Sequence, residues 1–336
     1  MKNVLVTGCS GFIGFHLSQK LMSNGFRVIG VDMMNDYYDI NLKKKRLFLL
    51  KKYDKRLFTF IKLNVSSNQK LESVFLNNKI DYIVHLAAQA GVRDSITNPH
   101  KYLNYNITGF LNILELAAKF KIKHLVYAST SSIYGLNNKF PFSVRDVADH
   151  QIQFYAVSKK TNELMAHTWS HLYNLPATGL RFFTVYGPWG RPDMALYKFA
   201  KNIIKNKKIS VFNNGNHVRD FTYIDDIVDG IYLALNKIPK PIKSKSKIDS
   251  SNSYAPHRIY NLGYGKEIKL LKFIRLIEKN IGKKAKINFL PMQAGDVHRT
   301  SADISDTQKD LGYMPKFSVE NGVKNFIDWF KTYHNY

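Results

Sequence analysis

The sequence predicts an α/β protein, with a doubly wound parallel sheet followed by a smaller C-terminal α/β unit. In the first half of the 336-residue chain, short apolar, β-rich runs alternate with longer segments of helical periodicity. Near-continuous apolar strands are typical of parallel sheets that helices cover on both faces. The first strand also runs directly into a glycine-rich turn that opens a helix. The regular alternation ends near residue 184, where the second unit is expected to begin.

Each expected strand is a short apolar run, and the expected helices are longer periodic segments between or after these runs. The strands are expected at residues 3–7, 27–32, 58–63, 82–87, 124–129, 177–183 and 258–262. The helices are expected at residues 12–23, 69–78, 106–120, 155–173, 194–206, 267–280 and 321–333. Residues 220–236 are expected to pack back onto the sheet. The segment 237–257, rich in Lys, Ser and Pro, is expected to be a mobile surface loop.

The composition restricts the classes of function. A formal net charge of +25 invites a nucleic-acid hypothesis. The lysines, however, form scattered clusters without interleaved aromatics, so we favour a solvated basic surface and do not expect nucleic-acid binding. Cys9 is the only cysteine, which excludes an intramolecular disulfide and fits a reducing compartment. No run approaches the roughly 18 apolar residues of a membrane span, and the N-terminus does not resemble a signal peptide. We expect a cytoplasmic protein without a membrane segment.

The glycine-rich turn spaces Gly8, Gly11 and Gly14 as G-x-x-G-x-x-G between the first strand and its helix. Glycines in this context let the backbone approach a pyrophosphate at a helix N-terminus. Asp32 ends the second strand, where a carboxylate accepts hydrogen bonds from both ribose hydroxyls and repels a 2′-phosphate. The expected cofactor is therefore NAD rather than NADP. The alternative is a glycine turn that binds no ligand.

Tyr155 and Lys159 form a candidate catalytic pair, because positions i and i+4 share one face of a helix. A neighbouring ammonium favours a phenolate and lowers the pKa of a tyrosine. Tyr197 and Lys201 have the same spacing, and we interpret them as an ordinary helix face. Around Tyr155, by contrast, the hydroxyls of residues 129–132 follow a strand at its carboxyl end, where open α/β sheets bind substrates. Packing and capping explain some of these hydroxyls, and at least one is expected to face the substrate.

Several motifs together resemble the extended short-chain dehydrogenase/reductase family, and within it the sugar-nucleotide 4-epimerases. They are "TGCSGFIG" (7–14), "HLAAQAGVR" (85–93), "STSSIYG" (129–135) and "YAVSKK" (155–160). Longer blocks at 36–47, 162–196, 219–231 and 290–297 extend the resemblance to essentially the whole chain and make it closest to the branch that acts on UDP-glucuronate.

The resemblance implies an NAD-dependent isomerase that interconverts UDP-glucuronate and UDP-galacturonate. Tyr155, as phenolate, takes the proton from the sugar O4 while hydride passes from C4 to NAD⁺, and the 4-keto sugar rotates before hydride returns to its other face. Lys159 lowers the pKa of Tyr155 and holds the nicotinamide ribose, and Thr130 and Ser132 bind the O4 region. The segment 129–135 lacks the acidic residue that sister dehydratases and decarboxylases generally place there, which favours simple epimerisation. The alternatives are a UDP-glucose/UDP-galactose 4-epimerase and a non-catalytic basic binding protein on the same fold.

The resemblance also implies two sets of binding residues and no metal. The cofactor-binding set comprises Gly8, Gly11, Phe12, Ile13, Gly14, Asp32, Asn64, Val65, Leu86, Ala87, Ala88, Gln89, Tyr155 and Lys159. The substrate-binding set comprises Arg93, Thr184, Arg191, Met194, Ala195, Leu196, Val211, Phe212, Asn213, Arg219 and Asp296. Arg191 is expected to bind the sugar carboxylate, which a neutral sugar lacks. The alternative is that Arg191 pairs with Asp193 or caps its own loop.

The expected division places residues 1–183, with about 218–236, in a Rossmann-like NAD-binding domain. Residues 184–217 and 237–336 form the expected sugar-nucleotide-binding domain. A homodimer is implied through the helices at 106–120 and 155–173. The chain departs from the family at Cys9, which makes the glycine loop a candidate for oxidation, and at Met33, Asn64 and Asp94, the last of which could neutralise Arg93.

Overall fold

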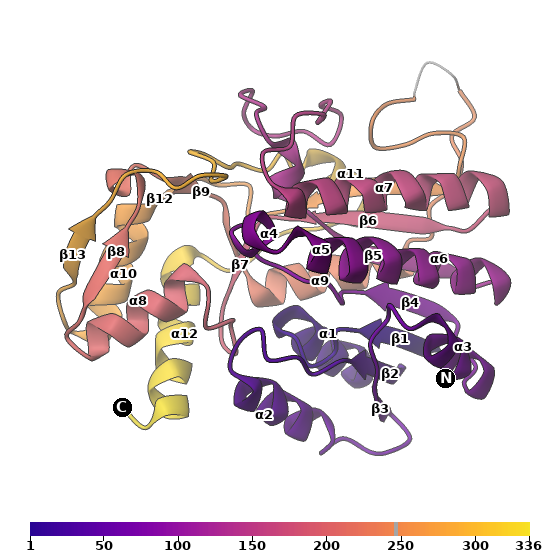
Figure 1. Ribbon diagram of the computed structural model, residues 1–336, viewed down its shortest axis with the longest axis horizontal. Helices are drawn as coiled ribbons and strands as arrows, with labels where there is room; N and C mark the ends of the chain where they lie inside the picture. Colours follow the sequence, from indigo (N-terminus) through magenta and orange to yellow (C-terminus); the bar gives the residue numbers. More distant parts are fainter. Residues whose placement is uncertain (245–247) are drawn as a thin grey trace.

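A computed structural model describes residues 1–244 and 248–336 and contains a seven-stranded parallel sheet (Figure 1). The strand order is β11-β6-β5-β4-β1-β2-β3. The strands are β1 (Asn3–Thr7), β2 (Arg27–Asp32), β3 (Phe58–Lys62), β4 (Tyr82–His85), β5 (His124–Thr130), β6 (Ala177–Phe182) and β11 (His257–Leu262). From β1 the chain builds outward to β3 and then crosses to β4 on the other side. The predicted doubly wound class is confirmed, with its switch point between β1 and β4.

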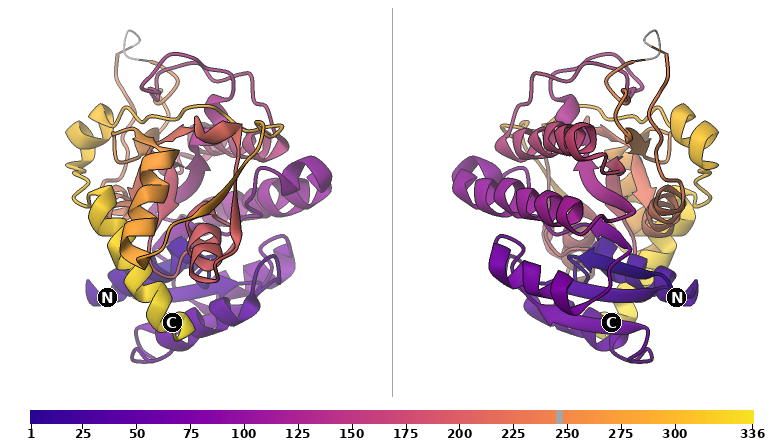
Figure 2. Two further views of the ribbon diagram at one scale, coloured as in Figure 1. Left: turned by 90° about the vertical axis from the view of Figure 1, so that its left-hand side faces the viewer. Right: turned by 90° about the vertical axis from the view of Figure 1, so that its right-hand side faces the viewer.

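Helices cover both faces of the sheet, because successive strand residues alternate between two apolar cores (Figure 2). One core packs Val4 and Val6 of β1 against α1 (Phe12–Ser23) and α9 (Ile224–Asn236). The other packs Leu5 against α3 (Asn68–Asn77), α6 (Gly109–Lys119) and α7 (Phe154–Tyr173). These helices match the expected segments to within a few residues.

Several short elements were not expected from the sequence. Residues 36–47 were interpreted only as a family block, yet Ile40–Leu50 form helix α2. Two short helices, α4 (Asp94–Thr97) and α5 (Pro99–Tyr102), lead into a π-helical segment at Leu103–Thr108, so α6 itself begins later than expected. A 3₁₀ turn at Ser131–Tyr134 follows β5, and another spans Asn213–Gly215.

The second unit, at the left of Figure 1, is built on small sheets and three helices. Strand β8 pairs with β13, β7 with β10, and β9 with β12. The strands are β7 (Thr184–Tyr186), β8 (Lys208–Val211), β9 (Val218–Arg219), β10 (Phe221–Tyr223), β12 (Ile268–Lys269) and β13 (Lys286–Phe289), and the helices are α8 (Ala195–Ile204), α10 (Leu270–Ile281) and α12 (Val319–His334). A further helix, α11 (Ser305–Leu311), contacts β11 and α9.

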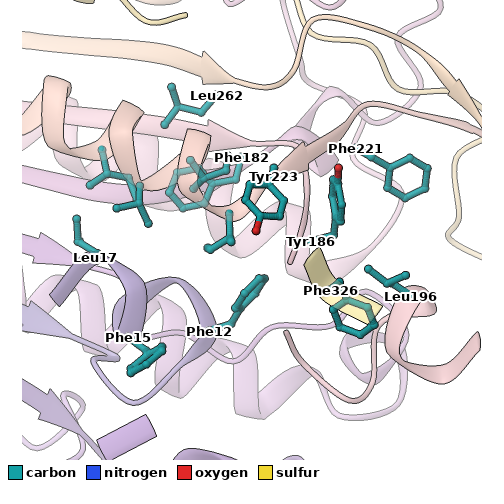
Figure 3. Packing of buried hydrophobic residues seen from close by; sticks show 14 of the residues in the cluster. Phe12, Phe15, Leu17, Phe182, Tyr186, Leu196, Phe221, Tyr223, Leu262 and Phe326 are labelled. Carbon is teal, nitrogen blue, oxygen red and sulfur yellow. The ribbon is translucent and has the colours of Figure 1, made fainter. Parts of the chain in front are cut away.

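The two units share one hydrophobic core (Figure 3). Phe12 of α1 and Phe182 of β6 belong to the same cluster as Tyr186, Phe221 and Phe326 of the second unit. The expected division placed residues 237–336 in the second domain, but the pairing of β11 with β6 makes residues 257–262 an edge of the main sheet. Of the loop expected at 237–257, residues 245–247 lie outside the described residues.

A buried ion pair joins α7 to β6 beneath the carboxyl end of the sheet. Arg181 donates from Nε and Nη2 to the two carboxylate oxygens of Glu163, each at 2.9 Å, and both side chains are at most 3% exposed. Ser129 donates to the same carboxylate at 2.6 Å. Burial alone would raise the pKa of Glu163, but the charge and hydrogen bonds of Arg181 lower it below its ordinary value. One of the four hydroxyls at 129–132 is therefore structural.

Glu163→Gln is expected to lower the free energy of unfolding by about 3–5 kcal/mol, because a neutral amide leaves the Arg181 guanidinium buried without a counter-charge. Urea unfolding followed by circular dichroism measures the loss. The matched control is Asp54→Asn, which breaks the exposed pair between Asp54 and Arg56. That control should leave the unfolding midpoint unchanged. Equal effects of the two substitutions would contradict the proposed importance of the buried pair.

Candidate active site

The glycine loop joins β1 to α1 and is too tightly packed to hold side chains. Gly8 has a φ of +74°, and a Cβ at this residue would lie 2.9 Å from the backbone nitrogen of Ala87. A Cβ at Gly14 would lie only 2.1 Å from the carbonyl oxygen of Gly8. No side chain caps the N-terminus of α1 at Gly11. The uncapped first-turn N–H groups suit a pyrophosphate, which fits the sequence prediction of a dinucleotide.

Asp32 ends β2 beside this loop, as expected. Its carboxylate accepts backbone N–H bonds from Ser10 at 3.1 Å and from Met34 at 2.8 Å. Each carboxylate oxygen therefore keeps acceptor capacity toward the cleft that Asp32 lines. This arrangement fits a ribose with two free hydroxyls.

A cleft of about 960 Å³ runs from the glycine loop to the second unit. Every residue of the expected cofactor-binding set lines it, and so do Thr130 and Ser132. The lining residues of the expected substrate-binding set are Arg93, Thr184, Arg191, Met194, Ala195, Phe212, Arg219 and Asp296.

Three expected substrate-binding residues do not line the cleft. Leu196 and Val211 are buried in the hydrophobic core, because the amphipathic α8 and the short strand β8 turn these positions inward. Asn213 lies in a 3₁₀ turn, and its amide instead lies 3.0 Å from Nδ1 of His298.

Tyr155 and Lys159 occupy the first turns of α7, at the carboxyl end of β5. Burial raises the pKa of Tyr155, while a hydrogen bond to the Thr130 side chain and the positive charge of Arg191 oppose this rise. The ammonium of Lys159 donates to the carbonyl oxygen of Ala128 at 2.9 Å, and burial lowers its pKa to about 8 despite the carboxylate of Glu163. The groups that lower the Tyr155 pKa in this structure are Thr130 and Arg191, and the role expected for Lys159 stays a prediction.

The hydroxyls after β5 divide into structural and cleft-facing groups. Ser129 is committed to Glu163, as described above. Thr130 donates to Ser132 Oγ at 3.2 Å and also caps the following 3₁₀ turn by accepting the Ser132 N–H at 3.2 Å. The Thr130 side chain also opposes the rise in the pKa of Tyr155, so this hydroxyl is a candidate partner of the base.

Arg191 reaches the cleft on a loop that is fastened to the glycine loop. The buried guanidinium of Arg46, on α2, donates to the carbonyl oxygens of Ser10 at 3.1 Å and of Trp189, and to the hydroxyl of Tyr38 at 2.7 Å. Trp189 itself adopts a left-handed φ of 60°. The loop before Arg191 is thus held in a fixed conformation by a residue that sequence reasoning missed.

The side chain of Arg191 forms a two-point ion pair with Asp193. Its Nε lies 3.0 Å from Oδ1 and its Nη2 lies 2.5 Å from Oδ2. Its guanidinium carbon lies 5.7 Å from the centre of the Tyr37 ring. The alternative that the sequence left open, a pairing of Arg191 with Asp193, is therefore present in the structure.

Asp94 and Asn106 have structural roles at the wall of the cleft. Asp94 accepts hydrogen bonds from Gln89, Asn98 and Tyr102. It does not pair with Arg93, whose guanidinium instead lies 5.2 Å from the Phe212 ring centre. The side-chain oxygen of Asn106 accepts the N–H of Gln89, and its amide nitrogen donates to Ser158. Asn106 thus supports the cleft wall from behind.

Lys43, also on α2, lines the cleft and was likewise missed by sequence reasoning. It is 6% exposed, and its ammonium donates to Asn35 and lies 4.8 Å from the centre of the Tyr38 ring. The sequence position of Lys43 could have indicated its burial, because Lys43 and Arg46 fall on the same side of α2 as Leu42, Leu47 and Leu50.

Among residues 1–244 and 248–336, no group of His, Cys, Asp and Glu side chains forms a metal site, and no helix is long and apolar enough to cross a membrane.

A glycine-cradled cleft at the switch point of a parallel sheet, with a Tyr-Lys pair at its wall, defines a nucleotide-dependent enzyme of the short-chain dehydrogenase type. The chain belongs to the NAD-dependent epimerase/dehydratase family, whose model matches residues 4–263. It is 49% identical to "Protein CapI" of Staphylococcus aureus, over 98% of this chain and 99% of that relative. It is 43% identical to a probable UDP-glucuronate 4-epimerase of Rhizobium meliloti, over 97% and 96% of the two chains.

Solved structures of sugar-nucleotide epimerases also resemble this chain over nearly its whole length. The UDP-glucuronic acid 4-epimerase of Bacillus cereus, solved with UDP-glucuronic acid and NAD, matches with a TM-score of 0.86 at 32% identity and covers 98% of this chain and 99% of its own. The UDP-glucose 4-epimerase of Thermotoga maritima, solved with UDP-glucose, matches with a TM-score of 0.84 at 28% identity over 99% of each chain.

Cys9 is expected to resist alkylation in the folded protein. Its thiol is fully buried, and burial together with the charge of Asp32 raises its pKa well above the ordinary value, so little thiolate forms. Iodoacetamide at pH 8 should therefore label the intact protein only after urea is added, as mass spectrometry would show. Because Cys9 is the only cysteine, the label is unambiguous. Rapid labelling without urea would restore the expectation of an oxidation-sensitive loop.

Proposed function

We propose that this chain interconverts UDP-glucuronate and UDP-galacturonate, as an isomerase that oxidises the sugar at C4 and then reduces it from the opposite face. The observation that carries the proposal is the presence of Tyr155, Thr130 and Arg191 in one cleft. There a sugar hydroxyl meets a base and a sugar carboxylate meets a guanidinium. The Bacillus cereus and Rhizobium meliloti relatives, both named for this substrate, support it.

The cofactor is NAD, which the glycine cradle, the uncapped start of α1 and the Asp32 carboxylate all fit. Bound NAD supplies the hydride acceptor for the oxidation at C4 and the hydride donor for the return. The residues of the expected cofactor-binding set would hold it along the cleft.

Tyr155 moves the proton. As a phenolate it accepts the O4 proton of the sugar, and it returns that proton when the alcohol re-forms. Deprotonation of a buried phenol needs support. The charge of Arg191 provides it, and the Thr130 hydroxyl would add to it by turning from Ser132 to donate to the phenolate. Lys159 would add to this support and contact the nicotinamide ribose, once its ammonium turns from the carbonyl of Ala128.

Arg191 selects the acid sugar in this proposal. Asp193 uses the Nε–Nη2 edge of the guanidinium, so the substrate carboxylate would bind at the remaining edge or displace Asp193. Thr184, which also lines the cleft, would complete the carboxylate contact. Rigid fixation of the carboxylate would also protect a 4-keto sugar acid from decarboxylation.

The second candidate substrate pair is UDP-glucose and UDP-galactose. The specific observation that favours it is the same ion pair, because an arginine neutralised by Asp193 presents less charge to a carboxylate. The similarity to the Thermotoga maritima enzyme supports the same candidate.

We further propose a cytoplasmic homodimer that pairs through α6 and α7. Large apolar side chains on α7 are exposed, with Leu164 at 60% and Leu172 at 63%, and Val157 is also exposed. Association of two copies through this face would cover these residues.

The function is tested by incubating the purified protein with UDP-glucuronate and, separately, with UDP-glucose, and separating the 4-epimers. Turnover of UDP-glucuronate to UDP-galacturonate is expected without net consumption of NAD. Tyr155→Phe should abolish turnover while NAD remains bound, because it removes only the hydroxyl that transfers the proton. Absence of turnover of the acid by the wild type would refute the proposal.

Arg191→Ala is expected to reduce kcat/KM for UDP-glucuronate by about tenfold to a hundredfold, since one charge-assisted contact contributes about 1.5–3 kcal/mol. Any turnover of UDP-glucose should change far less. Steady-state kinetics with both substrates measure the difference. Lys201→Ala, on the exterior of α8, is the matched control for loss of a positive charge. Equal losses on the acid and the neutral sugar would remove the selective role of Arg191.

A further inference from the structure

His217 lines the cleft immediately before β9 and has no explained partner. Its side chain is only 5% exposed, and within residues 1–244 and 248–336 neither ring nitrogen makes a hydrogen bond. The backbone around it is fixed, because the His217 carbonyl oxygen accepts the N–H of Leu270 at 2.9 Å. A buried polar group left unpaired is costly, so such a group facing a cleft indicates a ligand contact.

The surroundings of His217 carry charge, and the backbone of His298 lies close to its ring, but in the described part of the chain neither nitrogen has a well-formed hydrogen bond. Nε2 lies 3.5 Å from an Asp296 carboxylate oxygen, at a geometry that forms no hydrogen bond. Asp296 already accepts from Arg219 at 2.8 Å and from the N–H of Val297 at 2.9 Å. The other titratable group that acts on it, within the described residues, is His298 on the same segment as Asp296.

The position of His217 indicates which part of a nucleotide sugar it contacts. Residues 217 and 219 are two apart on an extended segment and so point to the same side, which places His217 beside Arg219. Both line the cleft with Phe212, on the second unit, whereas the reacting hydroxyl of Tyr155 lies on the sheet side. An imidazolium next to a guanidinium is suited to phosphate oxygens.

We propose that His217 is a binding residue for the diphosphate of the substrate and that it takes up a proton when the nucleotide sugar binds. This inference rests on the proposed function only in requiring a nucleoside-diphosphate sugar as ligand. It assigns to this chain a contact whose strength changes near neutral pH.

The sign of the pH dependence follows from the surroundings. Burial lowers the pKa of His217 below its ordinary value, Arg219 lowers it further, and Asp296 and the backbone of His298 oppose them. A bound diphosphate would raise this pKa, because it stabilises the charged imidazolium. The gain in affinity is therefore complete at pH values below the pKa of the free protein. It is lost as the pH rises through the pKa of the complex.

The experiment measures binding of UDP-glucuronate and of UDP-glucose to the NAD-loaded Tyr155→Phe protein, in which turnover is blocked. Neither ligand's phosphates titrate near neutral pH, so any proton taken up belongs to the protein. Isothermal titration calorimetry from about pH 6 to about pH 8.5, in two buffers of different ionisation enthalpy, gives both Kd and proton uptake. The variants are His217→Gln and, as the matched control, His298→Gln, which removes an exposed neighbouring histidine.

We expect affinity to fall roughly tenfold across this range in the parent protein, with net proton uptake at the acidic end. His217→Gln should abolish both effects and retain the affinity measured at the alkaline end, and His298→Gln should retain both. An unchanged pH profile in His217→Gln, or an equal loss of affinity at every pH, would overturn the proposal. A pH-dependent Kd for UDP-glucose in a protein that does not turn over UDP-glucuronate would refute the proposed function and leave this inference intact.

Discussion

The buried guanidinium of Arg46 is the interaction on which the geometry of the cleft most depends. A charge without access to water needs acceptors, and the two terminal nitrogens of this guanidinium find them in Ser10, Tyr38 and Trp189. These three residues belong to the glycine loop, the segment before α2 and the loop that carries Arg191. A single side chain therefore fixes the distance between the part of the cleft that fits the cofactor and the part assigned to the sugar carboxylate.

The sequence predicted those features in which local chemistry and periodicity agree. The strands and long helices of the sheet follow from apolar periodicity, and Gly8, Asp32 and Tyr155 are recognisable because their residue types suit their places beside strands. The burial of Arg46 and Lys43 was not predicted, because a lysine-rich helix usually indicates a solvated surface. Their burial arises from contacts with segments distant in sequence, such as Trp189, which no local pattern encodes.

The remaining differences have the same origin. Leu196 and Val211 lie next to true cleft residues in sequence, but alternation along a helix and a strand turns them into the core. Strand β11 joins the main sheet through pairing with β6, and the sequence separation of those two strands hides that relation. The pairing of Arg191 with Asp193 depends on side-chain rotamers, and only the structure shows it.

The hydrophobic core that runs without interruption from α1 to α12 restricts how this molecule can work. The two units share one hydrophobic core, so a large rigid-body movement of one unit against the other would disrupt the packing of close-packed aromatic side chains. Inversion of a sugar carbon in this cleft would then not depend on separation of the two units. The group that moves would be the hexose ring, which would rotate between the two walls of the cleft while the nucleotide holds it in place.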